Sequence, residues 1–140
     1  MKRILIANCI LLASTVVQAS PQVDCLAKMA YMEARGINKQ AVKDVTDVMF
    51  NRIKHYKFPD SVCKNINKKG QYTWAAKGSK VKDIQTYKAI YKQVDSEYAK
   101  FKLGTWKDGT NGAMYFNNRP GKPYQKAKFL FKRNGHYFYK

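Results

Sequence analysis

The pattern of apolar residues changes near Leu103, and this change leaves few fold classes open. Before Leu103, apolar side chains recur at alternating three- and four-residue steps, as on one face of a helix. After it, five glycines punctuate three short β-prone runs, and Asn134-Gly135 between the last two is a strong hairpin signal. The runs cover residues 113–116, 129–131 and 136–139. The sequence therefore predicts an α+β fold, with helices first and a small antiparallel sheet at the end.

Apolar faces and capping residues predict four helices before this change. They are expected from Pro21 to a stop at Gly36, from Gln40 to His55, over a short piece with Val62, Cys63 and Ile66, and after the cap Asp83. The tyrosines of the last helix are interpreted as core, because the helical period alone explains their spacing. Asp44 and Asp47 are expected on the polar face of the second helix. The segment Gln71-Tyr72-Thr73-Trp74 is predicted to be extended.

Residues 1–19 have the features of a secretory signal peptide. Lys2 and Arg3 precede a mostly apolar stretch, and Val17-Gln18-Ala19 places small residues where a signal peptidase cuts. The stretch is shorter than the roughly 20 apolar residues of a membrane span, so no stable membrane anchor is expected. An uncleaved anchor that later leaves the membrane is the alternative. Residues 20–140 are expected to form one exported domain, located in the periplasm or outside the cell, in the wall.

Two cysteines, Cys25 and Cys63, remain after the predicted cleavage. An even pair in an exported domain predicts one disulfide, which would stabilise the fold by about 3–4 kcal/mol in the loop-entropy model. Two buried free thiols are the alternative. No cluster of cysteine and histidine has the spacing of metal ligands, so neither a metal nor another cofactor is expected.

Glu33 is one of only two glutamates in the chain. Leu26, Met29 and Ala30 precede it at helical spacing, so its carboxyl group is expected on the inward face of the first helix. Partial burial disfavours the charged form and raises the pKa of a carboxyl group toward the range of a general acid. Glu33 is therefore the candidate catalytic acid.

Six short motifs lie between residues 33 and 138. They are Glu33-Ala34-Arg35-Gly36, Asn51-Arg52, Phe58-Pro59, Gln71-Tyr72-Thr73-Trp74, Gly112-Ala113-Met114-Tyr115-Phe116 and Gly135-His136-Tyr137-Phe138. In their order and rough spacing they resemble the SleB-type cell wall hydrolases, which are spore-cortex-lytic enzymes and their bacterial and phage relatives. The resemblance covers Asp24 to Tyr139. It departs from the family pattern at Ile37, where a glutamate is expected, at Tyr72, where phenylalanine is usual, and in the expected lack of a separate wall-binding domain.

The resemblance implies a lytic transglycosylase-like domain with a lysozyme-related helical core, which cuts the MurNAc–GlcNAc β-1,4 bond of peptidoglycan. A conventional glycosidase needs two carboxyl groups at a defined separation, whereas this chain is poor in acids. A transglycosylase needs only one, because the C6 hydroxyl of muramic acid closes onto C1 as the acid protonates the leaving oxygen. Glu33 alone would then serve as acid and afterwards as base. If the product were hydrated instead, Asp108 is the first candidate for a second carboxylate.

Seven further residues are candidates for binding the glycan strand: Asn51, Arg52, Gln71, Tyr72, Thr73, Tyr115 and His136. Asn51 and Arg52 are candidates for orienting Glu33 or holding substrate, although a purely structural role at the helix end explains them equally well. Gln71 and Thr73 are candidates for hydrogen bonds to sugar hydroxyls, with Tyr72 or Trp74 stacking on a pyranose ring. Core packing is favoured for Trp74, and a structural hydrogen bond for His136.

The net charge of +18 falls to +16 without Lys2 and Arg3 and is spread over the whole mature chain. Such a charge favours encounters with polyanions, here the glycan strands of peptidoglycan and other anionic polymers of the cell envelope. A monomer is expected. Two other functions fit the charge: a wall-binding protein without catalysis, and a secreted nucleic-acid-binding module. Nucleic acid is not the expected partner, because no binding motif for it is present.

Overall fold

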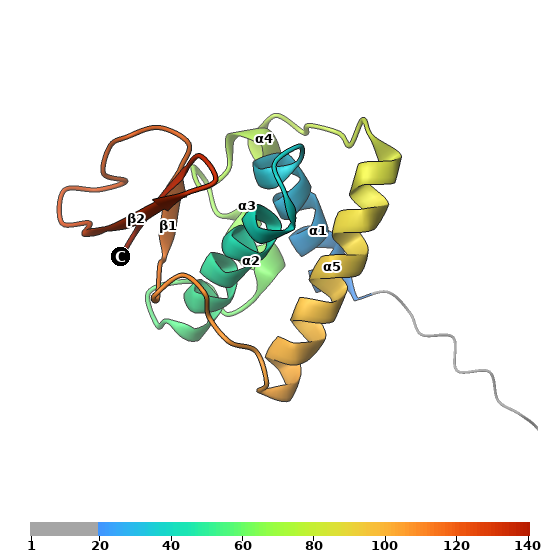
Figure 1. The fold of residues 1–140 in the computed structure, drawn as a ribbon, viewed down its shortest axis with the longest axis horizontal. Coiled ribbons are helices and arrows are strands. Elements are labelled where there is room, and N and C mark those ends of the chain that lie inside the picture. The colour runs from blue at the N-terminus through green and yellow to red at the C-terminus, as the bar shows by residue number, and fades with distance from the viewer. Residues whose placement is uncertain (1–19) are drawn as a thin grey trace, which may run out of the picture.

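Five helices and three strands make up the part of the chain that the computed structural model describes, residues 20–140 (Figure 1). The helices are α1 (Pro21–Ala34), α2 (Lys39–Lys54), α3 (Val62–Asn67), α4 (Thr73–Ala76) and α5 (Ile84–Leu103). The strands are β1 (Tyr115–Asn117), β2 (Phe129–Arg133) and β3 (His136–Tyr139). The predicted α+β class, with helices first, is confirmed. The predicted signal peptide lies outside the described residues.

Side-chain caps fix where three helices begin. The Asn38 side chain accepts a hydrogen bond from the Ala41 amide at the start of α2, and Ser61 does the same for α3. Asp83 caps α5 as predicted, with its Oδ1 3.0 Å from the amide nitrogen of Thr86. The long helix ends at Gly104, whose φ of 77° is the left-handed conformation that suits glycine.

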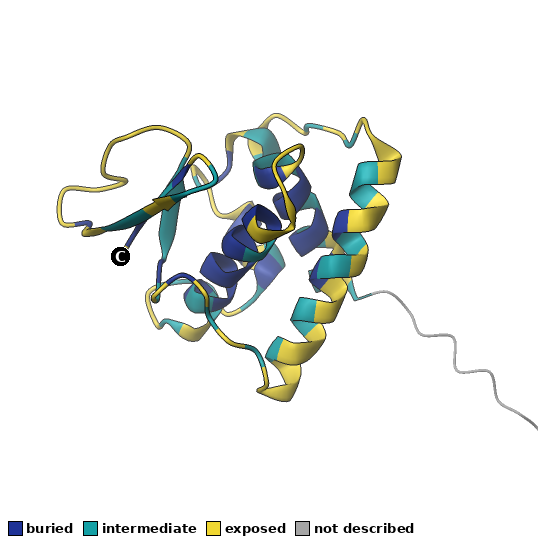
Figure 2. Ribbon diagram, viewed as in Figure 1, coloured by how far each residue is buried: buried dark blue, intermediate teal, exposed yellow. Residues whose placement is uncertain are grey.

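The helical core is built around α1, which packs against α2, α3 and α5. Figure 2 shows the buried residues gathered on the facing sides of these helices, with the outer side of α5 exposed. Tyr87, Tyr91 and Tyr98 of α5 pack against this core, which confirms their interpretation as core residues. Ile84, at the start of the same helix, is exposed instead.

A three-stranded antiparallel sheet follows the helices, in the order β1-β3-β2. Asn134 and Gly135 join β2 to β3 with φ values of 50° and 78°, as a two-residue hairpin turn of this type requires. Phe138 of β3 packs with Ala113 and with Val48 of α2 in a second small core. These contacts attach the sheet to α2.

A disulfide joins Cys25 of α1 to Cys63 of α3, with the two Cα atoms 5.4 Å apart. The predicted pairing is therefore present. Within residues 20–140, no helix is both long enough and apolar enough to cross a membrane.

The prediction of an extended segment at residues 71–74 is wrong in its second half. Tyr72 is extended, but Thr73 to Ala76 form the short helix α4. This segment packs beside α3 and is not part of the sheet. Ala75 and Ala76, which follow it, favour a helical turn.

The expected solvent exposure of Asp44 and Asp47 is also wrong, because both side chains are completely buried. Arg133 of β2 donates to both oxygens of Asp44, at 2.8 and 2.6 Å. Asp47 accepts hydrogen bonds from Lys43, the Trp106 indole and the Gly109 amide. The sheet and the segment after α5 therefore cover a face of α2 that the sequence pattern alone assigns to solvent.

Candidate active site

Glu33 lies in the last turn of α1 and is half-buried, between the buried residues of the core and an open cleft. The indole nitrogen of Trp74, on α4, donates a hydrogen bond to its Oε1 atom at 2.6 Å. The carboxyl group is therefore held in one orientation by a residue from a different element.

The pKa of Glu33 is raised above its ordinary value, as the sequence predicts. Burial is the main cause, because it disfavours the charged carboxylate. The Trp74 hydrogen bond and the positive charge of Arg52 act in the opposite direction, but they do not cancel the effect of burial. Glu33 therefore keeps its proton to a higher pH than an exposed glutamate, which is the state a general acid needs.

The cleft beside Glu33 has a volume of about 350 Å³ and lies between the helical core and the sheet. Its lining residues come from α1, α2, the segment around α4, β1 and the residue that follows β1. They are Glu33, Arg52, Gln71, Tyr72, Thr73, Phe116, Asn117 and Asn118. Five of the eight predicted site residues are thus brought together here. Glu33 is the one carboxylate in this lining.

Arg52 is almost completely buried and is fixed from two sides. Its Nε donates to the Met114 carbonyl at 2.6 Å, and its guanidinium donates to the Tyr72 hydroxyl at 3.1 Å. The rings of Phe58, Tyr72 and Tyr115 surround the guanidinium within 6 Å. The charge that acts on Glu33 is therefore held in a fixed position.

Asn51, the neighbour of Arg52, does not line this cleft. Its side-chain amide donates to the Thr110 hydroxyl at 3.2 Å and to the Ala113 carbonyl at 3.1 Å. Both contacts hold the segment that leads into β1. They agree with a structural role for Asn51, which the sequence analysis gave as the alternative to substrate binding.

Tyr115 does not line the cleft either. Its ring packs against Phe58 and Tyr124, with ring centroids 5.7 and 5.1 Å away. The next residue along β1, Phe116, lines the cleft instead. Side chains alternate between the two faces of a strand, so a shift of one residue exchanges the face.

His136 of β3 is 3% exposed and contacts the backbone of Glu33 rather than the cleft. Its Nε2 atom lies 3.2 Å from the Glu33 carbonyl oxygen, so the ring donates here in its Nε2–H form. Burial lowers the pKa of the ring, which favours this neutral form. His136 thus ties the sheet to the last turn of α1, a structural hydrogen bond as the sequence favours.

Three lining residues, Phe116, Asn117 and Asn118, are not among the predicted site residues, and the contact of Trp74 with Glu33 was not predicted either. Trp74 packs against the core as expected, yet its indole N–H reaches Glu33. A partly buried tryptophan needs an acceptor for that N–H, and this requirement was the available signal. The two asparagines directly follow the motif that ends at Phe116.

Asp108, the first candidate for a second carboxylate, is used within its own loop. Its oxygens accept hydrogen bonds from the Thr110 amide and hydroxyl at 2.8 and 2.6 Å and from the Gly112 amide at 2.6 Å. Burial acts to raise its pKa, but these hydrogen bonds outweigh it and the pKa is lowered. Asp108 lies outside the cleft lining, and residues 20–140 contain no cluster of side chains suited to a metal ion.

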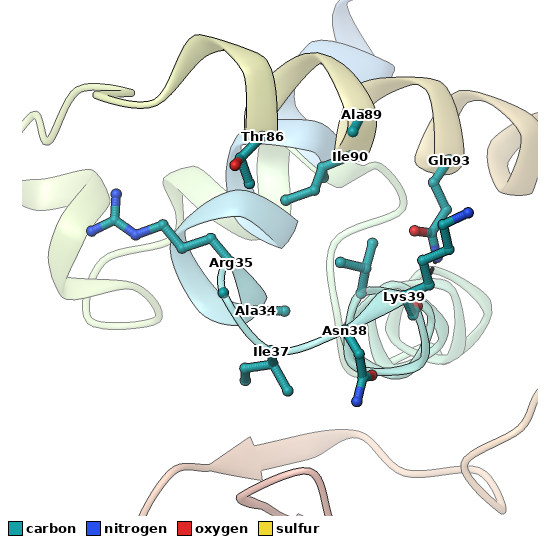
Figure 3. Close-up of a pocket in the computed structure, with 11 residues that line it drawn as sticks. Ala34, Arg35, Ile37, Asn38, Lys39, Thr86, Ala89, Ile90 and Gln93 are labelled. Carbon is teal, nitrogen blue, oxygen red and sulfur yellow. Dashed lines mark hydrogen bonds between the residues drawn. The ribbon is translucent and has the colours of Figure 1, made fainter.

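A second groove, of about 340 Å³, lies between the segment after α1 and the helix α5 (Figure 3). Ile37, at the position where the resemblance predicts a glutamate, is one of its lining residues. Figure 3 shows Thr86, Ile90 and Gln93 of α5 above Ala34 and Asn38. No carboxylate or histidine is among the residues that line this groove.

Comparisons with known proteins agree with the resemblance. The fold is similar to the crystal structure of the catalytic domain of the Bacillus cereus SleB protein, with a TM-score of 0.62 and 22% identity, over 85% of this chain and 89% of the other. It is also similar to the catalytic domain of the germination-specific lytic transglycosylase SleB from Bacillus anthracis, with a TM-score of 0.64 and 21% identity, over 89% and 98% of the two chains. No curated protein sequence matches the chain. A family model described as Cell Wall Hydrolase matches residues 36–139, a range that begins three residues after Glu33. Because this match covers well over half of the sequence, the chain belongs to the cell wall hydrolase family.

Proposed function

We propose that the protein is a peptidoglycan lytic transglycosylase that cleaves the MurNAc–GlcNAc β-1,4 bond with Glu33 as its acid and base. The observation that carries this proposal is the single carboxyl group in the cleft, whose pKa is raised by burial. The cleft lining supplies the one carboxyl group that a transglycosylase mechanism needs, whereas a conventional glycosidase requires two. The family supplies the substrate, since a cell wall hydrolase acts on peptidoglycan.

In this mechanism, protonated Glu33 donates its proton to the glycosidic oxygen as the bond to C1 of the muramic acid breaks. The C6 hydroxyl of the same sugar then attacks C1, and the Glu33 carboxylate accepts the hydroxyl proton. The products are a GlcNAc end with a free hydroxyl and a 1,6-anhydro muramic acid end. Glu33 returns to its protonated form, so no second carboxyl group and no water take part.

The rest of the cleft has separable roles in this proposal. Trp74 holds the carboxyl group of Glu33 in place, and the Arg52 charge stabilises the carboxylate that forms when the proton leaves. Gln71, Thr73, Asn117 and Asn118 supply amides and a hydroxyl for the sugar hydroxyl groups. Phe116 offers an aromatic ring for the apolar face of a pyranose.

The product distinguishes this mechanism from hydrolysis. Purified residues 20–140 are expected to release muropeptides that end in 1,6-anhydro muramic acid, each lighter by one water than the hydrated species. Mass spectrometry of digested sacculi measures this directly. Hydrated muropeptides as the primary product would overturn the transglycosylase mechanism, and intact sacculi after prolonged incubation would favour a wall-binding protein without catalysis.

Replacing Trp74 with phenylalanine tests how Glu33 is controlled. The Trp74 hydrogen bond lowers the pKa of Glu33, so its loss should raise that pKa further. Because the protonated form is the active acid, the alkaline limb of the pH–rate profile should move to higher pH, while the maximal rate falls about tenfold from lost orientation.

The other tryptophan provides the matched control. Trp106 donates its indole N–H to Asp47 at 2.8 Å, away from the cleft, so Trp106→Phe removes a similar bond. It should leave the alkaline limb in place. A limb that moves equally in both variants would contradict the role proposed for Trp74.

Export also belongs to this proposal. A disulfide is typical of proteins in oxidising compartments, and the substrate of the family lies outside the cytoplasm. A signal peptide over residues 1–19 would provide the route. Cleavage after Ala19 predicts a mature protein whose intact mass begins at Ser20 and is two hydrogens below the reduced value.

A further inference from the structure

Acidic and basic residues are unevenly distributed along the chain. All nine acidic residues of the sequence lie at or before Asp108. From Gly109 to Lys140 the chain has seven basic residues and no acidic one. One of the seven, Arg133, is paired with Asp44. The sheet and its connecting loop therefore form a purely cationic unit beside a helical core of mixed charge.

Four of these basic residues lie on the connection between β1 and β2: Arg119, Lys122, Lys126 and Lys128. We call them the cationic loop. All four are exposed, and none takes part in an ion pair formed by residues 20–140. Figure 2 shows this connection as an exposed arc beyond the strands. Their charges are therefore available to a ligand.

The cationic loop is held by several contacts to the sheet. The Asn117 side chain donates to the Gly121 carbonyl at 2.7 Å, and the Gly121 amide donates to the Tyr139 hydroxyl at 3.2 Å. Tyr124 packs on Tyr115. At the far end, the backbone of Lys128 exchanges two hydrogen bonds with Lys140, at 2.8 and 2.9 Å. The loop therefore presents its charges from an anchored backbone.

The cationic loop is continuous with the active-site cleft. Asn117 and Asn118 line the cleft, and Arg119 is the next residue. A glycan strand that leaves the cleft past the two asparagines passes onto the loop. The sugars of such a strand offer hydroxyl groups, whereas its stem peptides carry carboxylates, which are the natural partners of lysine and arginine side chains.

We propose that the cationic loop binds the stem-peptide carboxylates of the strand whose sugars occupy the cleft. This inference rests on the proposed function, because it takes peptidoglycan as the substrate. It assigns a specific place to an attraction that the total charge would otherwise spread over the whole surface. Charges beyond about 8 Å are largely screened at physiological ionic strength, so only cations adjoining the strand contribute strongly.

The test compares two triple variants that remove the same number of charges. Arg119→Gln/Lys122→Gln/Lys126→Gln changes the cationic loop, and Lys88→Gln/Lys92→Gln/Lys102→Gln changes exposed, unpaired positions of α5. Both are made in the Glu33→Gln protein, so that the sacculi stay intact. Pull-down with purified sacculi measures the affinity. The loop variant should lose about tenfold and the α5 variant less than about twofold, because only the loop adjoins the strand.

Chemical amidation of the sacculi identifies the anion. On sacculi whose carboxyl groups have been converted to amides, the Glu33→Gln protein and its loop variant should bind equally. Equal losses in the two triple variants would overturn the inference in favour of diffuse charge. A loop-dependent difference that persists after amidation would also overturn it, by assigning the loop to another anion such as a teichoic acid phosphate.

Clearance by the protein with Glu33 intact keeps this inference separate from the proposed function. If that protein clears sacculi and the two triple variants lose affinity equally, the loop inference alone fails. If the loop-dependent binding is found and no clearance occurs, the proposed enzyme activity alone fails.

Discussion

Glu33→Gln is expected to lower the rate of sacculus clearance by roughly 10²–10⁴-fold, because glutamine has no proton to donate to the leaving oxygen. Glutamine keeps the size of the side chain, and its carbonyl oxygen still accepts the hydrogen bond from Trp74. Burial already disfavours the charged form of Glu33, so a neutral side chain of the same size is tolerated at this position. The melting temperature should therefore stay close to that of the parent protein while the rate falls.

Glu97, the only other glutamate in the sequence, is the matched control for this variant. It lies on α5, paired with Lys100 at 3.0 Å and Lys43 at 3.8 Å, and it does not line the cleft. Glu97→Gln should cost below about 1 kcal/mol of stability and leave the rate nearly unchanged. Clearance by Glu33→Gln above about a tenth of the parent rate would show that Glu33 is not the acid.

Loss of the Cys25–Cys63 disulfide is expected to lower the melting temperature by about 10 °C. The bond closes a loop with a sequence separation of 38 residues. Its removal should cost about 3–4 kcal/mol through the entropy of the unfolded chain, and each kcal/mol shifts the melting temperature of a domain this size by a few degrees. Cys63→Ser, followed by differential scanning calorimetry, measures the effect. Activity near the melting range should fall with it, because α1 carries both Cys25 and Glu33.

The double variant Cys25→Ser/Cys63→Ser separates the bond from a reactive free thiol. It should melt close to Cys63→Ser, and a reductant should destabilise the parent protein but neither variant. A parent protein that is unaffected by reductant and retains two titratable thiols would contradict the disulfide.

Local signals predicted most of the fold. Asp83 caps its helix and Asn134-Gly135 makes its turn because each acts on backbone groups a few residues away. The errors concern partners that are distant in the sequence. Asp44 is buried because Arg133, 89 residues later, covers it. No periodicity within α2 carries that information.

In the candidate site, too, the features set by neighbouring residues were predicted and the contacts between distant residues were not. The inward position and raised pKa of Glu33 follow from apolar neighbours one turn away, and the structure agrees with both. Its hydrogen bond from Trp74 and its backbone contact with His136 span 41 and 103 residues. Predicting that Phe116 rather than Tyr115 lines the cleft would require the register of β1. That register is set by the pairing of β1 with β3.

The strand order of the sheet determines when the cleft can form as the chain is synthesised. β3 comes after both β1 and β2 in the chain, yet it lies between them and supplies His136 to the backbone of Glu33. A polypeptide that emerges amino end first therefore has no sheet until residues 136–139 are free, and the wall formed by Phe116 to Asn118 has no support until then. The helix that carries Glu33 is made first, and the cleft beside it is completed last. On the proposed function, such a chain would gain its activity only after its last strand has been released.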